Sequence, residues 1–382
     1  MIKVVHFGKY YYPDRGGIES VTSTIAERVT AIGHPNTVIC FSKSKCSSQE
    51  NVNGVNIIRA ATNILIHSQP IGIGYILACM KEGRKADVVH VHYPNMVAAL
   101  ACLFIGRRPR VLVHWHSDIV NKGFFGYIVR PLERLLLRRA DLVVPATMAY
   151  ARGSAAIAPF LHKVTAFPYG VEDPTRNTKS SNPLGGFPIE VESRLQGKRI
   201  ILAVGRLVPY KGFDVLIKSA RHIIPDAFIV IVGDGPLRQN LESVINNESA
   251  RDRILLAGKL NGEQLAHLFQ RASLFCLPSV ERSEAFGVVQ IEAMAYGIPV
   301  ITTEIPGSGV PWVNQDRVSG INVPPGDPHR LAGACNEILL SERLHMTLSI
   351  GARKRFLAEF SEQVFVERIV SAYRRLINGI IQ

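Results

Sequence analysis

The sequence predicts an α/β protein of two domains, each built on an open parallel sheet. Short β-branched runs alternate with amphipathic stretches of helix length, which is the rhythm of βαβ units. The chain has 382 residues, and one domain usually holds roughly 100–200 residues. The runs also fall into two sets, separated by a region rich in Pro, Gly and polar residues.

The two sets of runs define the expected domain boundaries. Strands are expected at residues 3–7, 38–41, 88–92, 111–116 and 142–145, and again at 200–204, 228–232, 254–257, 274–277 and 299–302. This spacing predicts an N-terminal domain over 1–172, a linker over 173–197 and a C-terminal domain over 198–360. The last stretch, 361–382, has helical spacing of apolar residues and is expected to pack back on the first domain.

Composition limits the class of protein and of partner. Hydrophobic residues make up 47% and charged residues 20%, a globular profile that excludes disorder and fibrous repeats. A net charge of +13 favours anionic partners, but charge alone does not rank nucleic acid, membrane or phosphorylated substrates. The cysteines lack metal-ligand spacing, and no signal-peptide or membrane-spanning pattern is present. We therefore expect a cytoplasmic protein that touches membrane at most from its surface.

Two carboxylates near the start of one predicted helix form the most informative motif. Glu284 lies in the preceding loop and Glu292 lies eight residues on, so both can serve one elongated ligand. Carboxylates accept paired hydrogen bonds from sugar diols. The backbone N–H groups of Phe286, Gly287 and Val288 lie near the helix start, which favours phosphate. The alternative is two solvated helix charges, which the small apolar neighbours of Glu292 disfavour.

A strand-to-loop segment at residues 204–212 supplies cations. Gly205 allows the backbone to approach a ligand, and Arg206 and Lys211 could hold a diphosphate, while Gly233 ends the next strand. Fixed cations and a helix N-terminus can stabilise a leaving diphosphate without a metal. The chain has no D-x-D motif, so we expect no metal, no other cofactor, and activity that survives a chelator. The alternative is that both cations are surface charges.

The predicted N-terminal domain has two further candidate positions. Gly16 and Gly17 follow the first strand, and their N–H groups could face a phosphate or an acceptor, although the dinucleotide-binding G-x-G-x-x-G spacing is absent. His116 and Asp118 follow another strand, at the edge where ligands of open α/β sheets collect. His114 is expected to point to the other face of the sheet and to serve in packing.

These motifs resemble those of a known enzyme family. The segment from Glu284 to Glu292 resembles the E-x7-E signature of retaining nucleotide-sugar glycosyltransferases, specifically glycosyltransferase family 4. Residues 204–212 and 231–236 resemble that family's phosphate-binding loop and next strand end, in the same order. The resemblance implies a GT-B fold, with two Rossmann-like domains whose parallel sheets face a central cleft. It assigns acceptor binding to the first domain and nucleotide-sugar binding to the second.

The resemblance also implies residue roles and a mechanism. It implies front-side attack, in which a donor phosphate oxygen takes the proton of the acceptor. Roles in catalysis are implied for His116, Glu284, Arg206 and Lys211. Donor contacts are implied for Gly16, Gly17, Gly205, Gly233, Phe286, Gly287, Val288 and Glu292, and Asp118 is placed near the acceptor.

The expected activity is that of a hexosyltransferase of surface-glycan biosynthesis. Mannose from GDP-mannose is the first choice, because residues 18–20 and 114–118 are similar to those of mannosyl and rhamnosyl transferases; the acceptor would be lipid-linked or a polysaccharide. UDP- or dTDP-sugar transfer is the nearest alternative, and a sugar-nucleotide epimerase would need no acceptor. A nucleic-acid partner is not expected, because aromatic residues are not interleaved with the basic ones.

Residues 121–140 form a basic, apolar stretch that allows two interpretations. Arg130, Arg134 and Arg138 are interleaved with leucines. Such a helix can lie on an anionic bilayer surface, where a lipid-linked acceptor would be found. It can also be a crossover helix whose leucines pack on the first sheet while only the arginines are exposed.

Overall fold

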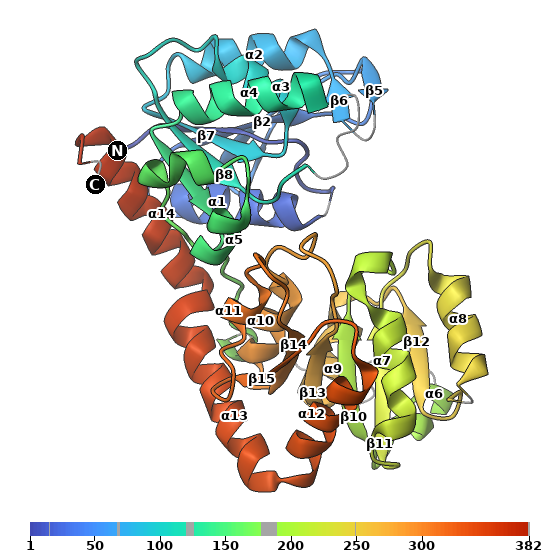
Figure 1. The fold of residues 1–382 in the computed structure, drawn as a ribbon. Helices are drawn as coiled ribbons and strands as arrows, with labels where there is room; N and C mark the ends of the chain where they lie inside the picture. Colours follow the sequence, from blue (N-terminus) through green and yellow to red (C-terminus); the bar gives the residue numbers. More distant parts are fainter. Residues whose placement is uncertain (15, 67–68, 120–125, 177–188, 249, 381–382) are drawn as a thin grey trace. The chain divides into compact units, whose positions relative to one another are not determined.

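A computed structural model describes residues 1–14, 16–66, 69–119, 126–176, 189–248 and 250–380 (Figure 1). The chain forms two compact units: Met1–Tyr169 with Glu362–Gln382, and Gly170–Ser361. The chain therefore passes between the units twice, and its C-terminal helix belongs to the first unit. Of the expected linker, residues 177–188 lie outside the described part, and helix α6 (Ile189–Leu195) belongs to the second unit.

The first unit contains a seven-stranded sheet in the order β3-β4-β2-β1-β7-β8-β9, parallel except for the edge strand β3. All the strands expected in this half are confirmed within two residues at each end. The edge pair β3 and β4 was not predicted, because β3 is polar and exposed. The bounds are β1 (Val4–Phe7), β2 (Asn36–Phe41), β3 (Ser48–Val52), β4 (Val55–Ala60), β7 (Val88–Tyr93), β8 (Arg110–Trp115) and β9 (Leu142–Pro145).

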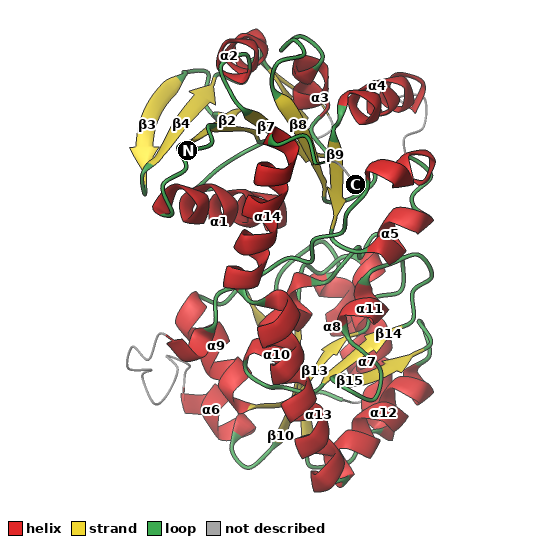
Figure 2. Cartoon of the chain, turned by 90° about the vertical axis from the view of Figure 1, so that its left-hand side faces the viewer, coloured by secondary structure: helices red, strands yellow, loops and turns green. Residues whose placement is uncertain are grey.

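Helices cover both faces of this sheet, as Figures 1 and 2 show. One face carries α1 (Gly17–Ala31) and the returning helix α14 (Glu362–Ile377). The other face carries α2 (Ile73–Gly83), α3 (Met96–Cys102) and α4 (Gly126–Arg139). Phe365, Ile369 and Tyr373 of α14 are fully buried, so this helix completes the core of the first unit. A hairpin of β5 (Ile64–Ile66) and β6 (Gln69–Ile71) precedes α2, and α5 (Met148–Gly153) follows β9.

The second unit contains a six-stranded parallel sheet in the order β12-β11-β10-β13-β14-β15. Every strand expected here is confirmed, and β15 is additional. The bounds are β10 (Arg199–Val204), β11 (Ala227–Val232), β12 (Ile254–Gly258), β13 (Ala272–Leu277), β14 (Val300–Thr303) and β15 (Gly320–Val323). The helices are α7 (Phe213–Ser219), α8 (Arg238–Asn247), α9 (Gly262–Arg271), α10 (Val288–Ala295), α11 (Val310–Val313), α12 (Pro328–Leu340) and α13 (Glu342–Arg355).

Strand alternation divides the core of the second unit into two faces. Leu274 and Cys276 of β13 face a core shared with α7, α8 and α12. Phe275 faces the opposite side, where its ring lies 6.1 Å from that of Phe269 on α9. The sheet is therefore buried on both faces, as expected for parallel sheets.

Both sheets share one topological feature that positions ligands. The strand order runs outward in two directions from a central pair, β1 and β7 in the first unit and β10 and β13 in the second. In open α/β sheets the loops that leave such a pair diverge and create a crevice at the carboxyl ends of the strands. Within the described residues, no helix is long and apolar enough to span a membrane.

Candidate active site

A buried ion pair lies at the switch point of the second sheet. Lys211 follows β10 and Glu284 follows β13, and these strands are neighbours in the sheet. The Lys211 Nζ lies 2.5 Å from the Glu284 Oε2, and each residue is only 8% exposed. The buried Ser279 Oγ donates a hydrogen bond to the same carboxylate at 3.1 Å. The structure thus joins one cation of the first motif to one carboxylate of the second.

Glycines allow the loops that carry this pair to meet. Gly212 has a φ of 64°, and a Cβ there would lie 2.2 Å from the Pro278 carbonyl oxygen. Gly233 has a φ of 137°, and a Cβ there would lie 1.9 Å from the Gly205 carbonyl oxygen. The side chain of Lys211 runs along Gly205, where a Cβ would be 3.2 Å from its Cε. A side chain at Gly212 or Gly233 would therefore clash with backbone and push apart the loops that hold the ion pair.

Arg206 lies in the same loop as Lys211 but is exposed. Its guanidinium forms no ion pair with any residue in the described ranges. It is close enough to Tyr210 to act on that phenol: burial raises the pKa of Tyr210, Lys211 lowers it, Glu284 raises it and Arg206 lowers it. The charges of Lys211, Glu284 and Arg206 therefore all act on one half-buried tyrosine, and the exposed Arg206 side chain is accessible to an anionic ligand.

Helix α10 carries the second carboxylate of the E-x7-E motif. Gly287 precedes the helix with a φ of 71°, and Glu292 lies in its second turn. Glu292 is half-buried, and desolvation raises the pKa of its carboxyl group. No hydrogen bond or ion pair joins Glu292 to Lys211 or Glu284, all three of which lie in the described residues. The Phe286 ring is buried against Phe360, so from this residue the backbone is the part suited to a ligand.

Gln290 is a residue of this motif that sequence reasoning missed. Its side chain is fully buried, and its Nε2 donates to the Phe286 carbonyl oxygen at 2.5 Å. Its Oε1 has no hydrogen-bond partner among the described residues. A glutamine inside an apolar run is the signal that could have identified it, because an amide is rarely buried without a specific partner.

The glycine turn of the first unit lies at the N-terminus of α1. Gly16 is extended and precedes the helix, and Gly17 is its first residue. The carboxylate of Glu19 turns back over Gly16, where a Cβ would lie 2.3 Å from its Oε2. In this structure an acidic side chain therefore lies beside the turn that was expected to face a phosphate or acceptor.

The strand end after β8 also differs in detail from expectation. Both ring nitrogens of His116 form hydrogen bonds inside the first unit, Nδ1 with the Tyr169 hydroxyl at 2.8 Å and Nε2 with His92 Nδ1 at 3.1 Å. The Asp118 carboxylate accepts from Trp115 Nε1 at 2.9 Å and from Ser154 Oγ at 2.6 Å. These bonds give Asp118 a role in shaping the loop.

The prediction that His114 points to the other face of the sheet was wrong, although its side chain is fully buried and packed, as expected. Its ring stacks on that of His116 with centroids 4.4 Å apart and planes 7° apart. Residues two positions apart on a strand share one face of the sheet, so the two imidazoles point the same way.

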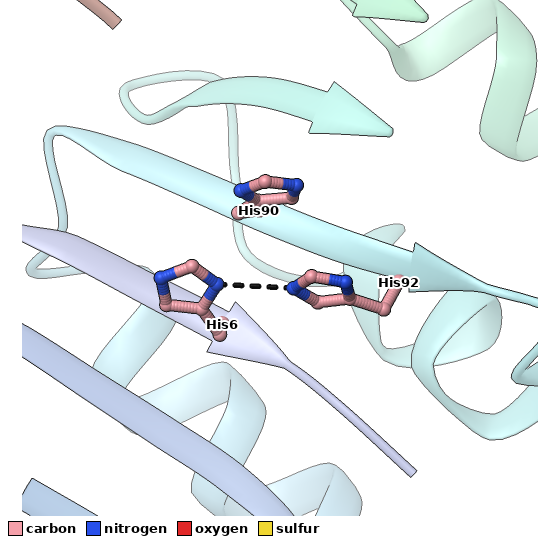
Figure 3. A group of neighbouring side chains, drawn as sticks. All are labelled: His6, His90 and His92. Atoms are coloured by element: carbon pink, nitrogen blue, oxygen red, sulfur yellow. Dashed lines mark hydrogen bonds between the residues drawn. The ribbon is translucent and has the colours of Figure 1, made fainter. Parts of the chain in front are cut away.

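The first unit holds a stack of buried imidazoles that the sequence analysis did not identify. The histidine stack consists of His6 on β1, His90 and His92 on β7, and His114 and His116 at β8; Figure 3 shows the first three. Its signal in the sequence was present, as histidines alternate with apolar residues on successive strands. Two groups in the stack have ring nitrogens close enough to consider a metal ion. The lone pairs of metal ligands must point at one ion. The rings of His92, His114 and His116 lie in planes only 7–16° apart, which is a stacking arrangement and directs their lone pairs side by side.

Comparisons with known proteins agree with this architecture. Residues 16–170 match the model described as "Glycosyl transferase 4-like domain", and residues 189–355 match "Glycosyl transferases group 1". The chain belongs to the group 1, family 4-type glycosyltransferases with the GT-B fold. The expected fold and enzyme class are confirmed.

Three individual proteins show how far the similarity extends along the chain. The chain is 28% identical to O-antigen chain mannosyltransferase C of Escherichia coli, over 99% of this chain and 100% of that protein. It is 29% identical to the D-rhamnosyltransferase WbpZ of Pseudomonas aeruginosa, over 86% of this chain and 84% of that protein. Among solved structures, Anabaena HepE in complex with UDP superposes with a TM-score of 0.77 at 19% identity, covering 97% and 99% of the two chains.

Proposed function

We propose that this glycosyltransferase moves a hexose, with mannose from GDP-mannose as the first choice, onto a lipid-linked or polysaccharide acceptor in surface-glycan biosynthesis, with retention at the anomeric carbon. The observation that carries the proposal is the Lys211–Glu284 pair at the switch point of the second sheet. The full-length similarity to an O-antigen mannosyltransferase and the similarity to a rhamnosyltransferase support the donor and the pathway.

The ion pair suits a site for a nucleoside diphosphate. Lys211 brings a fixed cation to the carboxyl ends of β10 and β13, and Arg206 adds a second one from the same loop. Glu284 holds the ammonium group in place and has a carboxylate able to accept from sugar hydroxyls. The half-buried Glu292 is the candidate for a ribose diol. Preorganised charges of this kind stabilise a leaving diphosphate most strongly where water is excluded.

In the proposed reaction the bond between the anomeric carbon and the donor phosphate oxygen breaks, and the acceptor oxygen bonds to that carbon from the same face. The acceptor proton passes to the departing phosphate oxygen, so no enzymatic nucleophile is needed. Lys211 and Arg206 compensate the negative charge that develops on the diphosphate. The anomeric configuration of the product, read by NMR, tests this step, and an inverted product would refute it.

A screen of nucleotide sugars tests the choice of donor. A ligand that binds only the folded protein raises its melting temperature. We expect GDP-mannose to raise it more than UDP-, dTDP- or ADP-sugars do. The Lys211→Met variant should lose most of this shift, and Lys218→Met, which removes an exposed lysine from the same unit, should keep it. A larger shift with a UDP-sugar would overturn the proposed donor but leave the transferase assignment intact.

The face of the first unit formed by α2, α3 and α4 supports a membrane-bound acceptor. On α4, Arg130, Arg134 and Arg138 are exposed while Leu136 and Leu137 are fully buried. The leucines therefore pack on the unit, and the arginines are left for solvent or an anionic surface; of the basic stretch, residues 121–125 lie outside the described part. Apolar side chains are exposed on the same group of helices, namely Ile73, Leu77, Leu100 and Leu135. Cations beside apolar groups favour binding to anionic lipid.

A further inference from the structure

A continuous hydrogen-bonded chain runs through the histidine stack of the first unit. Asn36 Oδ1 lies 2.9 Å from His6 Nε2, and His6 Nδ1 lies 3.1 Å from His92 Nε2 (Figure 3). His92 Nδ1 lies 3.1 Å from His116 Nε2, and His116 Nδ1 lies 2.8 Å from the Tyr169 hydroxyl. The chain crosses from β2 through β1 and β7 to the carboxyl end of β8.

The direction of every bond in this chain follows from one backbone carbonyl. The Asn36 Nδ2 lies 2.7 Å from the His34 carbonyl oxygen, which can only accept, so this amide nitrogen donates and Asn36 Oδ1 faces His6. His6 Nε2 must then carry the proton. A neutral imidazole has one donor and one acceptor nitrogen, so His6 Nδ1 accepts from His92 Nε2. By the same step His92 Nδ1 accepts from His116 Nε2, and His116 Nδ1 accepts from the Tyr169 hydroxyl.

Burial keeps the imidazoles in the neutral form that this pattern requires. Desolvation lowers the pKa of His6 to about 4, although the bond to Asn36 raises it, and lowers the pKa of His116 to about 3. Burial and the neighbouring histidines lower the pKa of His92 well below its ordinary value. A doubly protonated ring would also place two donors face to face within the chain.

A second layer of rings fixes the planes of the first. His90 stacks on His92 with centroids 4.4 Å apart and planes 10° apart, and His114 stacks on His116 in the same way. His90 Nδ1 is 2.6 Å from the Tyr373 hydroxyl of α14. The His116 ring is therefore fixed in its plane by stacking and in its tautomer by hydrogen bonds.

We propose that Asn36, His6 and His92 are positioning residues that hold His116 as the Nε2-protonated tautomer, so that its Nδ1 can pair only with a hydrogen-bond donor. In this structure the donor is Tyr169. The inference rests on the proposed function, in which the resemblance to family 4 gives His116 a role in catalysis. The expected selectivity is for a donating substrate group, since an acceptor such as a carbonyl oxygen would face a lone pair.

Two substitutions of His92 separate this role from packing. His92→Asn retains an oxygen acceptor near the position of Nδ1 for His116 but loses the donor to His6. His92→Gln retains a donor near the position of Nε2 but loses the acceptor for His116. Both variants remove the same imidazole ring, that of His92, from the stack. We expect His92→Asn to keep the His116 tautomer and His92→Gln to lose it.

The experiment labels the histidines of the full chain with 15N and reads each tautomer from two-bond 1H–15N couplings. In the unsubstituted protein, His6, His92 and His116 should all carry the proton on Nε2. The kcat of His92→Gln should be about tenfold below that of His92→Asn, because one hydrogen bond is lost. The dissociation constant for nucleoside diphosphate should be unchanged in both variants, since its proposed site lies in the second unit.

Asn36→Leu should weaken the preference of His116 for the same tautomer, because it removes the group that fixes the far end of the hydrogen-bonded chain. Asn56→Leu is its matched control, because Asn56 lies on the neighbouring strand β4 and bonds to Thr37 and Gln49 outside the stack. A proton on His116 Nδ1 in the unsubstituted protein would overturn the assignment of tautomers. Different tautomers with equal kcat in the two His92 variants would overturn the positioning role. Absence of any sugar transfer would refute the proposed function while leaving the NMR result valid.

Discussion

Replacing Lys211 by methionine tests the buried ion pair directly. The side chain keeps a similar length but loses its charge, so Glu284 remains buried with Ser279 as its recorded hydrogen-bond donor. Removing one partner of a buried pair costs about 3–5 kcal/mol. For a unit of this size each kcal/mol lowers the melting temperature by roughly 2–4 °C, so a loss of roughly 6–20 °C is expected. Loss of one preorganised charge should lower kcat by about 10²–10³-fold.

The assay combines thermal unfolding with steady-state transfer kinetics, and two further variants separate the effects. Lys218→Met removes an exposed pair with Asp214, which contributes only about 0.3–0.5 kcal/mol, so it should leave both readouts nearly unchanged. Lys211→Met combined with Glu284→Gln removes the stranded charge and should regain most of the melting temperature, but kcat should stay low. A double variant that melts no higher than Lys211→Met, or a single variant with near-normal kcat, would refute this reasoning.

Four other predictions follow from the same structure. His116→Ala should lower kcat far more than it weakens nucleotide binding, and equal losses in the two measurements would count against a place near the transferred sugar. Chelation by EDTA should leave initial transfer rates unchanged, and restoration of a lost rate by added divalent metal would contradict this. Acid should destabilise the first unit, because burial lowers the pKa of His6 from 6.5 to about 4 and the unfolded chain therefore binds more protons between these pH values. The free energy of unfolding should fall by about 3 kcal/mol as the pH falls from about 6.5 to about 4. Melting curves of the His6→Leu variant should depend less on pH over that range. Charge reversal at Arg130, Arg134 and Arg138 should reduce cosedimentation with anionic liposomes at low salt, and unchanged sedimentation would exclude this face.

Much of the fold could be predicted because hydrophobic patterning reports burial. Strands such as Ala227–Val232 and Val300–Thr303 are runs rich in β-branched residues and buried along their whole length, because a parallel sheet buries such runs on both faces. The edge strand Ser48–Val52 could not be found this way, because all of its residues except Val52 are polar and exposed. Its pairing with β4 depends on tertiary structure, which local composition does not report.

The candidate site could be predicted in part. Lys211 and Glu284 follow adjacent parallel strands, so the motif order was enough to bring them to one edge of the sheet. The exposure of Arg206 depends on the path of the glycine loop that carries it, which no periodicity describes. The histidine stack was missed because each imidazole was considered alone, whereas strand register brings them together.

The position of helix α14 in the chain affects the order in which the two units can fold during synthesis. The core of the first unit includes Phe365, Ile369 and Tyr373, which the ribosome adds only after the whole second unit. Domains generally fold as units during synthesis, so the second unit can close while the first still lacks one of its helices. Truncation before residue 362 should therefore impair the first unit and spare the second.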